Sequence, residues 1–202
     1  MKILSDIIDN LDNISEDDNE KFIEEIEKDY DFIIGYQTNE IEELENISNT
    51  LAEYYHSLGL CNQWSKIIDR RNEVQTIISK LKGKSEEYLE CYTDVEFVYA
   101  CTLLESGKKI NDSISVFKEL TDLLPNDEAI QLKLKIAKYN RRMKVYTILW
   151  ITSLGFSFVF MIFRYFKGPT PYRFYSDIGW GMYILFFLLG FIDRYFTFKN
   201  AQ

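Results

Sequence analysis

Hydrophobic positions recur at helical spacing along the first 124 residues, and turn signals divide them into successive stretches. The stretches lie at about 2–13, 18–34, 40–58, 64–82, 85–106 and 110–124. In each stretch apolar side chains repeat every three or four positions, which places them on one face of an α-helix. Most stretches end at a residue that disfavours helix continuation, namely Gly35, Gly59, Gly83, Gly107 or Pro125. Strand-like alternation is nearly absent, so the pattern predicts an all-α domain.

The pattern changes towards the C-terminus, where runs without charge replace the amphipathic spacing. Val145 to Phe163 are nineteen consecutive uncharged residues, and Ile178 to Ile192 are fifteen. At 1.5 Å per residue the first run makes a helix of about 28 Å, enough to cross a hydrocarbon core of roughly 30 Å. We therefore expect a transmembrane hairpin over 145–198, with spans at 145–166 and 176–196.

The second run is marginal, because fifteen residues span only about 22 Å. One reading extends it through Tyr195–Phe198, with Arg194 pairing Asp193; the alternative is a re-entrant or interfacial helix. The breakers between the two runs are Gly168, Pro169 and Pro171.

Four residues are expected to serve in membrane anchoring: Trp150, Gly155, Trp180 and Gly190. Trp150 should lie at the inner membrane interface and Trp180 at the outer one, where amphipathic aromatic rings are enriched. Small residues permit close helix contact, and they are Ser153 and Ser157 on the first run and Gly179, Gly181 and Gly190 on the second.

Charge divides the chain into an acidic and a basic part. Residues 1–127 hold 29 acidic and 12 basic side chains, whereas residues 128–202 hold 3 acidic and 11 basic ones. The juxtamembrane basic residues are Lys133, Lys135, Lys138, Arg141, Arg142 and Lys144. Eight basic residues flank the hairpin on its terminal side and three lie in its loop, so the positive-inside rule predicts both termini in the cytoplasm. The acidic domain disfavours nucleic acid as a partner.

These features predict three parts: an acidic helical domain at 1–127, a basic juxtamembrane helix at 128–144, and the hairpin. The juxtamembrane helix should run straight into the first span. Leu132, Ile136, Tyr139, Met143 and Tyr146 follow heptad spacing along it. They are expected to cover the end of the helical domain, and the alternative is a seam for self-association.

A search for chemistry assigns no catalytic, cofactor-binding or metal-binding residue. His56 has no second histidine or cysteine at ligand spacing, and Cys61 is its neighbour in sequence. Cys91 and Cys101 are expected to be core residues. The acidic run Asp17–Asp31 is expected to be a solvated face, with a basic partner as the alternative. Neither apolar run has an ionisable group at its middle, which argues against a proton relay or an ion-coupled transporter.

One segment resembles the second half of a tetratricopeptide (TPR) repeat: Leu103 to Gly107 followed by Ser113 to Asn126. The resemblance is best at 86–127, extends to about residue 140, and has a fainter echo at 40–83. It implies a helical-hairpin stack in which Ser113 lets paired helices approach and Phe117 and Leu120 form the repeat core. It also implies that Pro125 starts the next helix. The 48-residue spacing of Gly59 and Gly107 departs from the family's pattern.

Two functions follow as expectations. The first is a membrane-anchored, TPR-like adaptor that is not an enzyme and binds a partner protein, or a second copy of itself, at the cytoplasmic face of a membrane of the bacterial inner-membrane kind. The alternative is an oligomerising, defence-type membrane effector whose helical domain senses a signal and whose hairpin perturbs the bilayer. Neither reading requires a cofactor.

Overall fold

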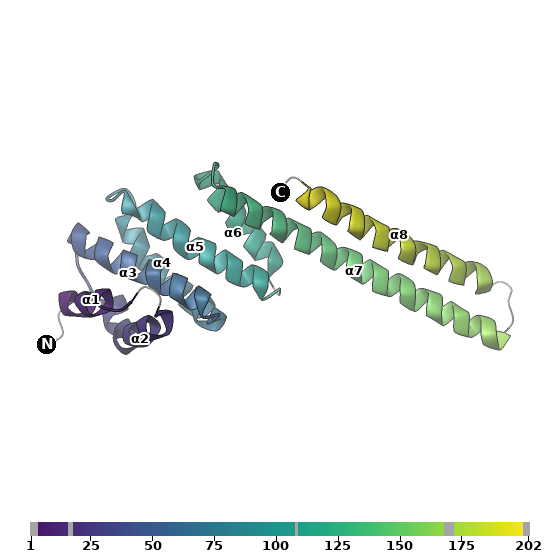
Figure 1. The fold of residues 1–202 in the computed structure, drawn as a ribbon, viewed down its shortest axis with the longest axis horizontal. Helices are drawn as coiled ribbons and strands as arrows, with labels where there is room; N and C mark the ends of the chain where they lie inside the picture. The colour runs from purple at the N-terminus through teal and green to yellow at the C-terminus, as the bar shows by residue number, and fades with distance from the viewer. Residues whose placement is uncertain (1–3, 16–17, 108, 168–171, 200–202) are drawn as a thin grey trace. The chain divides into compact units, whose positions relative to one another are not determined.

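The computed structural model describes residues 4–15, 18–107, 109–167 and 172–199 (Figure 1). Within them the chain forms eight α-helices and one 3₁₀ turn, and it forms no strand, which confirms the all-α prediction. The helices are α1 (Leu4–Asp12), α2 (Asn19–Gly35), α3 (Ile41–Leu60), α4 (Trp64–Ile78), α5 (Glu87–Glu105), α6 (Ile110–Leu123), α7 (Glu128–Lys167) and α8 (Tyr172–Phe198), with the turn η1 at Ser79–Leu81. The chain divides into two compact units, residues 1–131 and 132–202.

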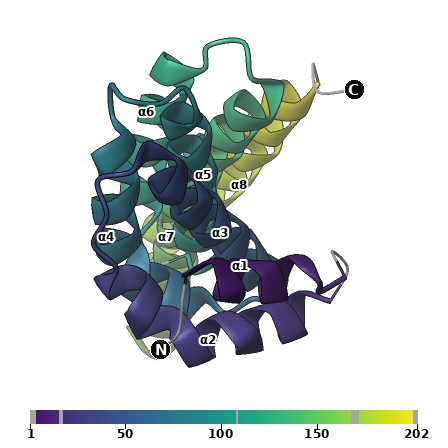
Figure 2. The same cartoon turned by 90° about the vertical axis from the view of Figure 1, so that its left-hand side faces the viewer.

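The first unit stacks its helices in chain order. α1 packs on α2, α2 on α3, and α3 on both α4 and α5, while α6 closes the far side against α5. Figure 2 looks onto the α1–α2 end of this unit, with α3 and α5 behind it. Each of the six stretches predicted from the sequence corresponds to one of these helices, because tertiary packing uses the same apolar faces that the spacing indicates.

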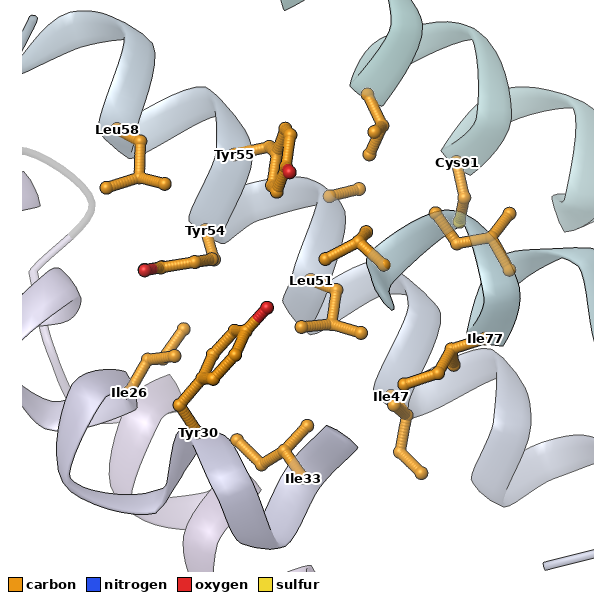
Figure 3. Packing of buried hydrophobic residues seen from close by; sticks show 14 of the residues in the cluster. Ile26, Tyr30, Ile33, Ile47, Leu51, Tyr54, Tyr55, Leu58, Ile77 and Cys91 are labelled. Atoms are coloured by element: carbon orange, nitrogen blue, oxygen red, sulfur yellow. The ribbon is translucent and has the colours of Figure 1, made fainter. Parts of the chain in front are cut away.

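The core lies mainly between α2 and α3 and continues to α4 and α5. Figure 3 shows Tyr30 of α2 directed towards Tyr54 and Leu51 of α3. The side chains buried without measurable exposure include Ile26, Leu51, Tyr54, Tyr55, Leu58, Ile67, Val74, Leu81, Val95, Leu103, Phe117 and Leu120. Burying a large apolar side chain contributes about 1.5–3 kcal/mol, so these buried side chains supply the main stabilisation of the unit.

Four glycines were predicted to stop helices, and α2 ends at the first of them, Gly35. Gly83 and Gly107 adopt positive φ angles of 73° and 64°, a conformation that glycine takes without steric cost. Gly59 instead lies inside α3, where a Cβ would meet Val98 Cγ1 of α5 at 3.2 Å. The left-handed residue after α3 is Asn62, with φ of 54°. α3 therefore ends one residue after the predicted stop, with Asn62 and not Gly59 in the left-handed conformation, and Gly59 serves close helix packing.

The turn between α6 and α7 also differs from the sequence expectation. Pro125 lies in the turn and is exposed, so it does not start the next helix. α7 begins at Glu128, and Asp127 caps it by accepting a hydrogen bond from Ile130 N at 3.0 Å. A side-chain cap therefore sets the helix start here, in place of the fixed φ of proline.

A charged network joins α2, α3 and α4 at the edge of the core. Glu27 accepts hydrogen bonds from Tyr54 Oη at 2.6 Å, from Lys66 Nζ at 2.8 Å, and from two nitrogens of Arg70, each at 2.8 Å. The Arg70 guanidinium also lies over the ring of Tyr30, 3.9 Å from its centroid. Burial alone would raise the pKa of Glu27, but the hydrogen bonds from Arg70, Lys66 and Tyr54 outweigh it and lower this pKa from 4.5 to about 2.

The first unit should therefore lose stability in acid through Glu27. A carboxyl whose pKa is lower in the folded state stabilises the fold above its unfolded pKa, and this contribution disappears as the pH falls from 4.5 towards 2. Water screens the partly exposed site, so we expect a loss of about 1–2 kcal/mol. Urea unfolding at several pH values measures it. Glu27→Gln should lower stability at pH 6 and leave a weaker pH dependence; equal slopes in both proteins would contradict the assignment.

The second unit contains most of α7 together with α8. Both helices are long and apolar enough to cross a membrane, over Glu128–Phe166 and Arg173–Thr197. α7 runs unbroken from the basic residues into the apolar run, as expected. α8 starts earlier and ends later than the predicted second span, so the fifteen-residue run does not limit its length. Gly168, Pro169 and Pro171 lie outside the described residues.

Polar contacts join α7 and α8 near the C-terminal end of α8. Arg142 Nε donates to Asp193 Oδ2 at 2.8 Å, and Arg142 Nη2 donates to Thr197 Oγ1 at 3.1 Å. The sequence reading that pairs Asp193 with Arg194 is therefore wrong. Asp193 and Arg194 are adjacent on α8, so their side chains point about 100° apart around the helix. Asp193 can therefore face Arg142 on α7 while Arg194 points elsewhere.

Small residues allow α7 and α8 to pack closely at two positions along the hairpin. A Cβ at Gly179 would overlap Ser157 Oγ and lie 3.0 Å from Ser157 N, so only glycine fits there. A Cβ at Gly190 would contact the Met143 side chain at 3.6 Å. Gly155 and Gly181 have nothing within 4 Å of a Cβ, so they do not serve the contact between these helices. Trp150 stacks on Tyr183 at 5.3 Å, and Trp180 is exposed.

The heptad positions on α7 differ in their exposure and contacts along the helix. Leu132 is 41% exposed, whereas the buried positions at the start of this helix are Ile130, Leu134 and Ala137. Further along, Met143 and Tyr146 contact the position of Gly190 in the same chain. The heptad spacing therefore reflects packing inside the hairpin over its second half, because the positions that face a neighbouring helix recur at three and four residues.

Candidate functional site: an acidic cleft

The first unit contains a cleft of about 780 Å³, which α1, α2, α3 and α5 surround. Its lining residues are Leu11, Ile14, Ser15, Asn19, Phe22, Asn49, Ala52, Glu53, His56, Ser57, Glu87, Glu90, Cys91 and Asp94. The cleft is within the size range of about 300–1,000 Å³ that is usual for ligand sites. The walls come from the exposed sides of α3 and α5, next to the faces that these helices bury in the core.

The cleft combines an apolar part with a strongly acidic part. Leu11, Ile14, Phe22 and Ala52 supply apolar surface from the α1–α2 side and from α3. The carboxylates are Glu53 on α3 and Glu87, Glu90 and Asp94 on α5. Among the described residues that line the cleft, none is a lysine or an arginine. A concave surface with this lining favours an amphipathic ligand that carries positive charge.

A chain of hydrogen bonds fixes one wall of the cleft. The Cys91 thiol donates to Asn49 Oδ1 at 2.9 Å, and Asn49 Nδ2 donates to Glu87 Oε2 at 2.8 Å. Burial, followed by the charges of Glu87, Asp94 and Glu90, raises the pKa of the Cys91 thiol to about 11. Because the thiolate is the reactive form, this thiol is held in its unreactive state at neutral pH. These hydrogen bonds connect α3 to α5 at this wall of the cleft.

Two carboxylates of α5 remain available to a ligand. Glu90 and Asp94 are both exposed and lie one helical turn apart, where like charges repel. Burial and then the charge of Glu90 raise the pKa of Asp94, and His56 acts in the opposite direction. Within the described residues neither Glu90 nor Asp94 forms a salt bridge. A cation placed between them would relieve this repulsion.

The residues singled out from the sequence lie at different places in the fold. His56 is exposed and lines the acidic cleft, whereas Cys61 follows α3 and lines a separate cavity with Glu20, Glu27 and Lys66. The structure therefore does not bring His56 and Cys61 to one site. Of the acidic run 17–31, the described residues reach the cleft only near its start, at Asn19 and Phe22, and Glu27 belongs to the charged network.

The other predicted residues lie away from the cleft. Phe117 and Leu120 are fully buried, and the Phe117 ring meets that of Phe97 on α5 at 6.0 Å with an edge-to-face geometry. Ser113 is buried and donates to Ala100 O at 2.8 Å. The juxtamembrane basic residues are exposed or half-buried along α7, and Arg142 is the one that pairs with Asp193.

Sequence reasoning missed Glu53, Glu87, Glu90, Cys91 and Asp94 as members of one site. The spacing of Glu87, Glu90, Cys91 and Asp94 on a single helix face was a usable signal, since residues three and four apart are neighbours on a helix. In the described part of the chain, no group of three or more histidine, cysteine or carboxylate side chains could hold a metal ion. Comparison of the chain with known protein families, with curated proteins and with solved structures finds no match.

Proposed function

We propose that this chain is a membrane-anchored adaptor whose acidic cleft binds a basic, amphipathic segment of a partner protein. The observation that carries the proposal is the cleft itself, about 780 Å³ in volume, with carboxylates on α3 and α5 beside apolar surface. Glu90 and Asp94 are like charges one helical turn apart, and the charge of Glu90 raises the pKa of Asp94, so a bound cation would relieve their repulsion. Such a feature is typical of binding sites, where function opposes stability.

The proposal places the acidic unit at the cytoplasmic face of a membrane, of the bacterial inner-membrane kind, held by α7 and α8. Support comes from the two membrane-length helices and from the excess of basic residues on the terminal side of the hairpin. The basic residues of α7 would lie near anionic headgroups, which attract them. The acidic unit would be repelled from the same surface, which leaves its cleft accessible to a partner.

The α5–α6 pair supports a TPR-like reading of the domain. Ser113, Phe117 and Leu120 are all buried where the two helices meet, which is where the small and large residues of a TPR hairpin lie. Stacked helical hairpins form concave surfaces that bind protein segments. In this proposal the domain uses such a surface, formed by α1, α2, α3 and α5.

Site-directed photocrosslinking in cells tests the adaptor proposal. A benzophenone side chain is placed at His56, inside the cleft, and at Asn72, an exposed position of α4 outside it. We expect adducts from His56 only, joined to a lysine- and arginine-rich segment that mass spectrometry identifies. Adducts of equal yield at both positions, or a captured segment without basic residues, would overturn the proposal.

A pair of charge reversals provides the matched control. Glu90→Lys with Asp94→Lys should reduce the His56 adduct at least tenfold, because the attraction changes to repulsion. Asp31→Lys with Glu42→Lys changes net charge by the same amount at exposed positions outside the cleft and should leave the adduct unchanged. Equal loss in both double variants would mean that overall charge, and not the cleft, controls binding.

Vesicle leakage separates the adaptor from the alternative membrane effector. An adaptor reconstituted into dye-filled vesicles should leave them intact, whereas an oligomerising effector releases the dye. The contacts of Met143 and Tyr146 with the Gly190 position inside one chain favour the first outcome, because they occupy residues that a self-association seam would need. Leakage that rises with protein density would support the effector.

A further inference from the structure

A second cavity lies within the hairpin, on one side of the α7–α8 pair. It measures about 320 Å³ and runs along Tyr139, Met143, Tyr146, Thr147 and Trp150 of α7. From α8 it is lined by Phe186, Phe187, Gly190, Phe191 and Arg194. The lining on α7 covers eleven residue steps, a length of about 16 Å along the helix. The cavity is therefore a narrow, elongated groove between two helices.

The walls of this groove are apolar along nearly their whole length. Thr147 Oγ1 donates to Met143 O at 2.8 Å, so the hydroxyl is satisfied within its own helix. Gly190 contributes no side chain, and this keeps the groove open opposite Met143. Aromatic and methionine side chains form most of the remaining surface, and methionine adapts its shape to flexible ligands. The surface suits a hydrocarbon chain.

One end of the groove carries a cation that is available to an anion. Arg194 lines the groove and is exposed, and within the described residues it forms no salt bridge. Its neighbour Asp193 does not compete, because Arg142 pairs with that carboxylate at 2.8 Å. Arg142 therefore neutralises Asp193, the residue next to Arg194 in the sequence. A guanidinium binds phosphate oxygens in a bidentate manner, which a lysine cannot do.

We propose that the groove between α7 and α8 binds an anionic phospholipid, with one acyl chain along Met143, Trp150 and Phe187 and the headgroup phosphate at Arg194. The charge of Arg194 and the apolar length of the groove select this occupant over a soluble anion, which would leave the groove empty. The inference rests on the membrane placement of the hairpin in the proposed function, and it does not depend on the acidic cleft. Lipid bound here fills the space beside Gly190 and stabilises the contact between the two helices.

Fluorescence quenching by brominated lipids tests this site, because Trp150 lines the groove. The full chain, with Trp64 and Trp180 replaced by phenylalanine, is reconstituted into phosphatidylcholine vesicles that contain a minor share of phosphatidylglycerol. Bromine is placed on the acyl chains of one lipid at a time. We expect brominated phosphatidylglycerol to quench Trp150 well beyond its share of the bilayer.

Two variants locate the effect at the groove. Arg194→Gln should reduce the preference for the anionic lipid about tenfold, the range for loss of a charged hydrogen-bonded contact. Lys199→Gln removes a nearby charge that does not line the groove and should leave the preference intact. Gly190→Leu should lower quenching by either lipid, because its side chain would occupy the groove.

The outcomes separate the lipid site from the membrane placement. Quenching in proportion to bulk composition, or a preference equal in the parent and Arg194→Gln, would overturn the lipid site alone. No quenching by either brominated lipid would mean that Trp150 is not in the bilayer, which would overturn the membrane placement as well.

Discussion

Arg71→Met should destabilise the first unit by about 3–5 kcal/mol, one of the two largest effects that we expect from a single substitution. Glu96 is only 1% exposed, and Arg71 holds it with two hydrogen bonds, Nε to Oε1 at 2.9 Å and Nη2 to Oε2 at 2.8 Å. Gln75 also donates to this carboxylate. Removing Arg71 leaves a buried carboxylate without its countercharge, and it also removes the cation over the Tyr99 ring.

Urea unfolding of the fragment 1–131 measures this effect. The double variant Arg71→Met with Glu96→Leu should recover most of the loss, because replacing both members of a buried pair by apolar residues restores a satisfied interior. Lys28→Met is the matched control, since the Lys28–Glu25 pair is largely exposed and should contribute below about 0.5 kcal/mol. A loss below 1 kcal/mol in Arg71→Met would contradict the burial of Glu96.

Phe117→Ala should lower the free energy of unfolding of the first unit by about 3–5 kcal/mol, because it leaves a cavity between α5 and α6. The Phe117 side chain has no measurable exposure and meets Phe97 across this helix pair. A unit of this size has about 5–15 kcal/mol of total stability. We expect its melting temperature to fall by at least about 10 °C.

Thermal unfolding of the fragment 1–131, monitored by circular dichroism, measures this change in melting temperature. Leu123→Ala on the same helix is the control, because Leu123 is 42% exposed and its truncation should shift the melting temperature by a few degrees at most. Similar melting of the Phe117→Ala variant and the parent would show that the α5–α6 contact does not stabilise the unit.

The helices were predictable because their signals are local. Apolar spacing and turn residues lie within a few positions of each other, and they located all six helices of the first unit to within a few residues. Failures arose where a tertiary contact decides the role of a residue. Gly59 reads as a helix stop, and α3 does end one residue later, but the sequence does not indicate that Gly59 also lets Val98 of α5 pack closely against it. Pro125 reads as a helix start, but the Asp127 cap sets that boundary.

The cleft was not predictable, because its residues come from distant parts of the chain. His56 looked isolated in sequence, and its neighbour there, Cys61, lines a different cavity. Cys91 lies 35 positions further along and yet lines the same cleft. Hydrophobic spacing reports which face of a helix is buried, and it does not report which exposed faces of α3 and α5 lie beside each other.

The anchoring of the acidic unit by a membrane hairpin is the central claim, and cysteine labelling of topology tests it most directly. The native residues Cys61, Cys91 and Cys101 are replaced, and single cysteines are introduced at Thr170 and at Ala201. With an impermeant maleimide on intact bacterial cells, we expect Thr170 to react and Ala201 to react only after the membrane is opened. Reaction of both positions from the same side would contradict the hairpin, because the second helix would then not cross the bilayer.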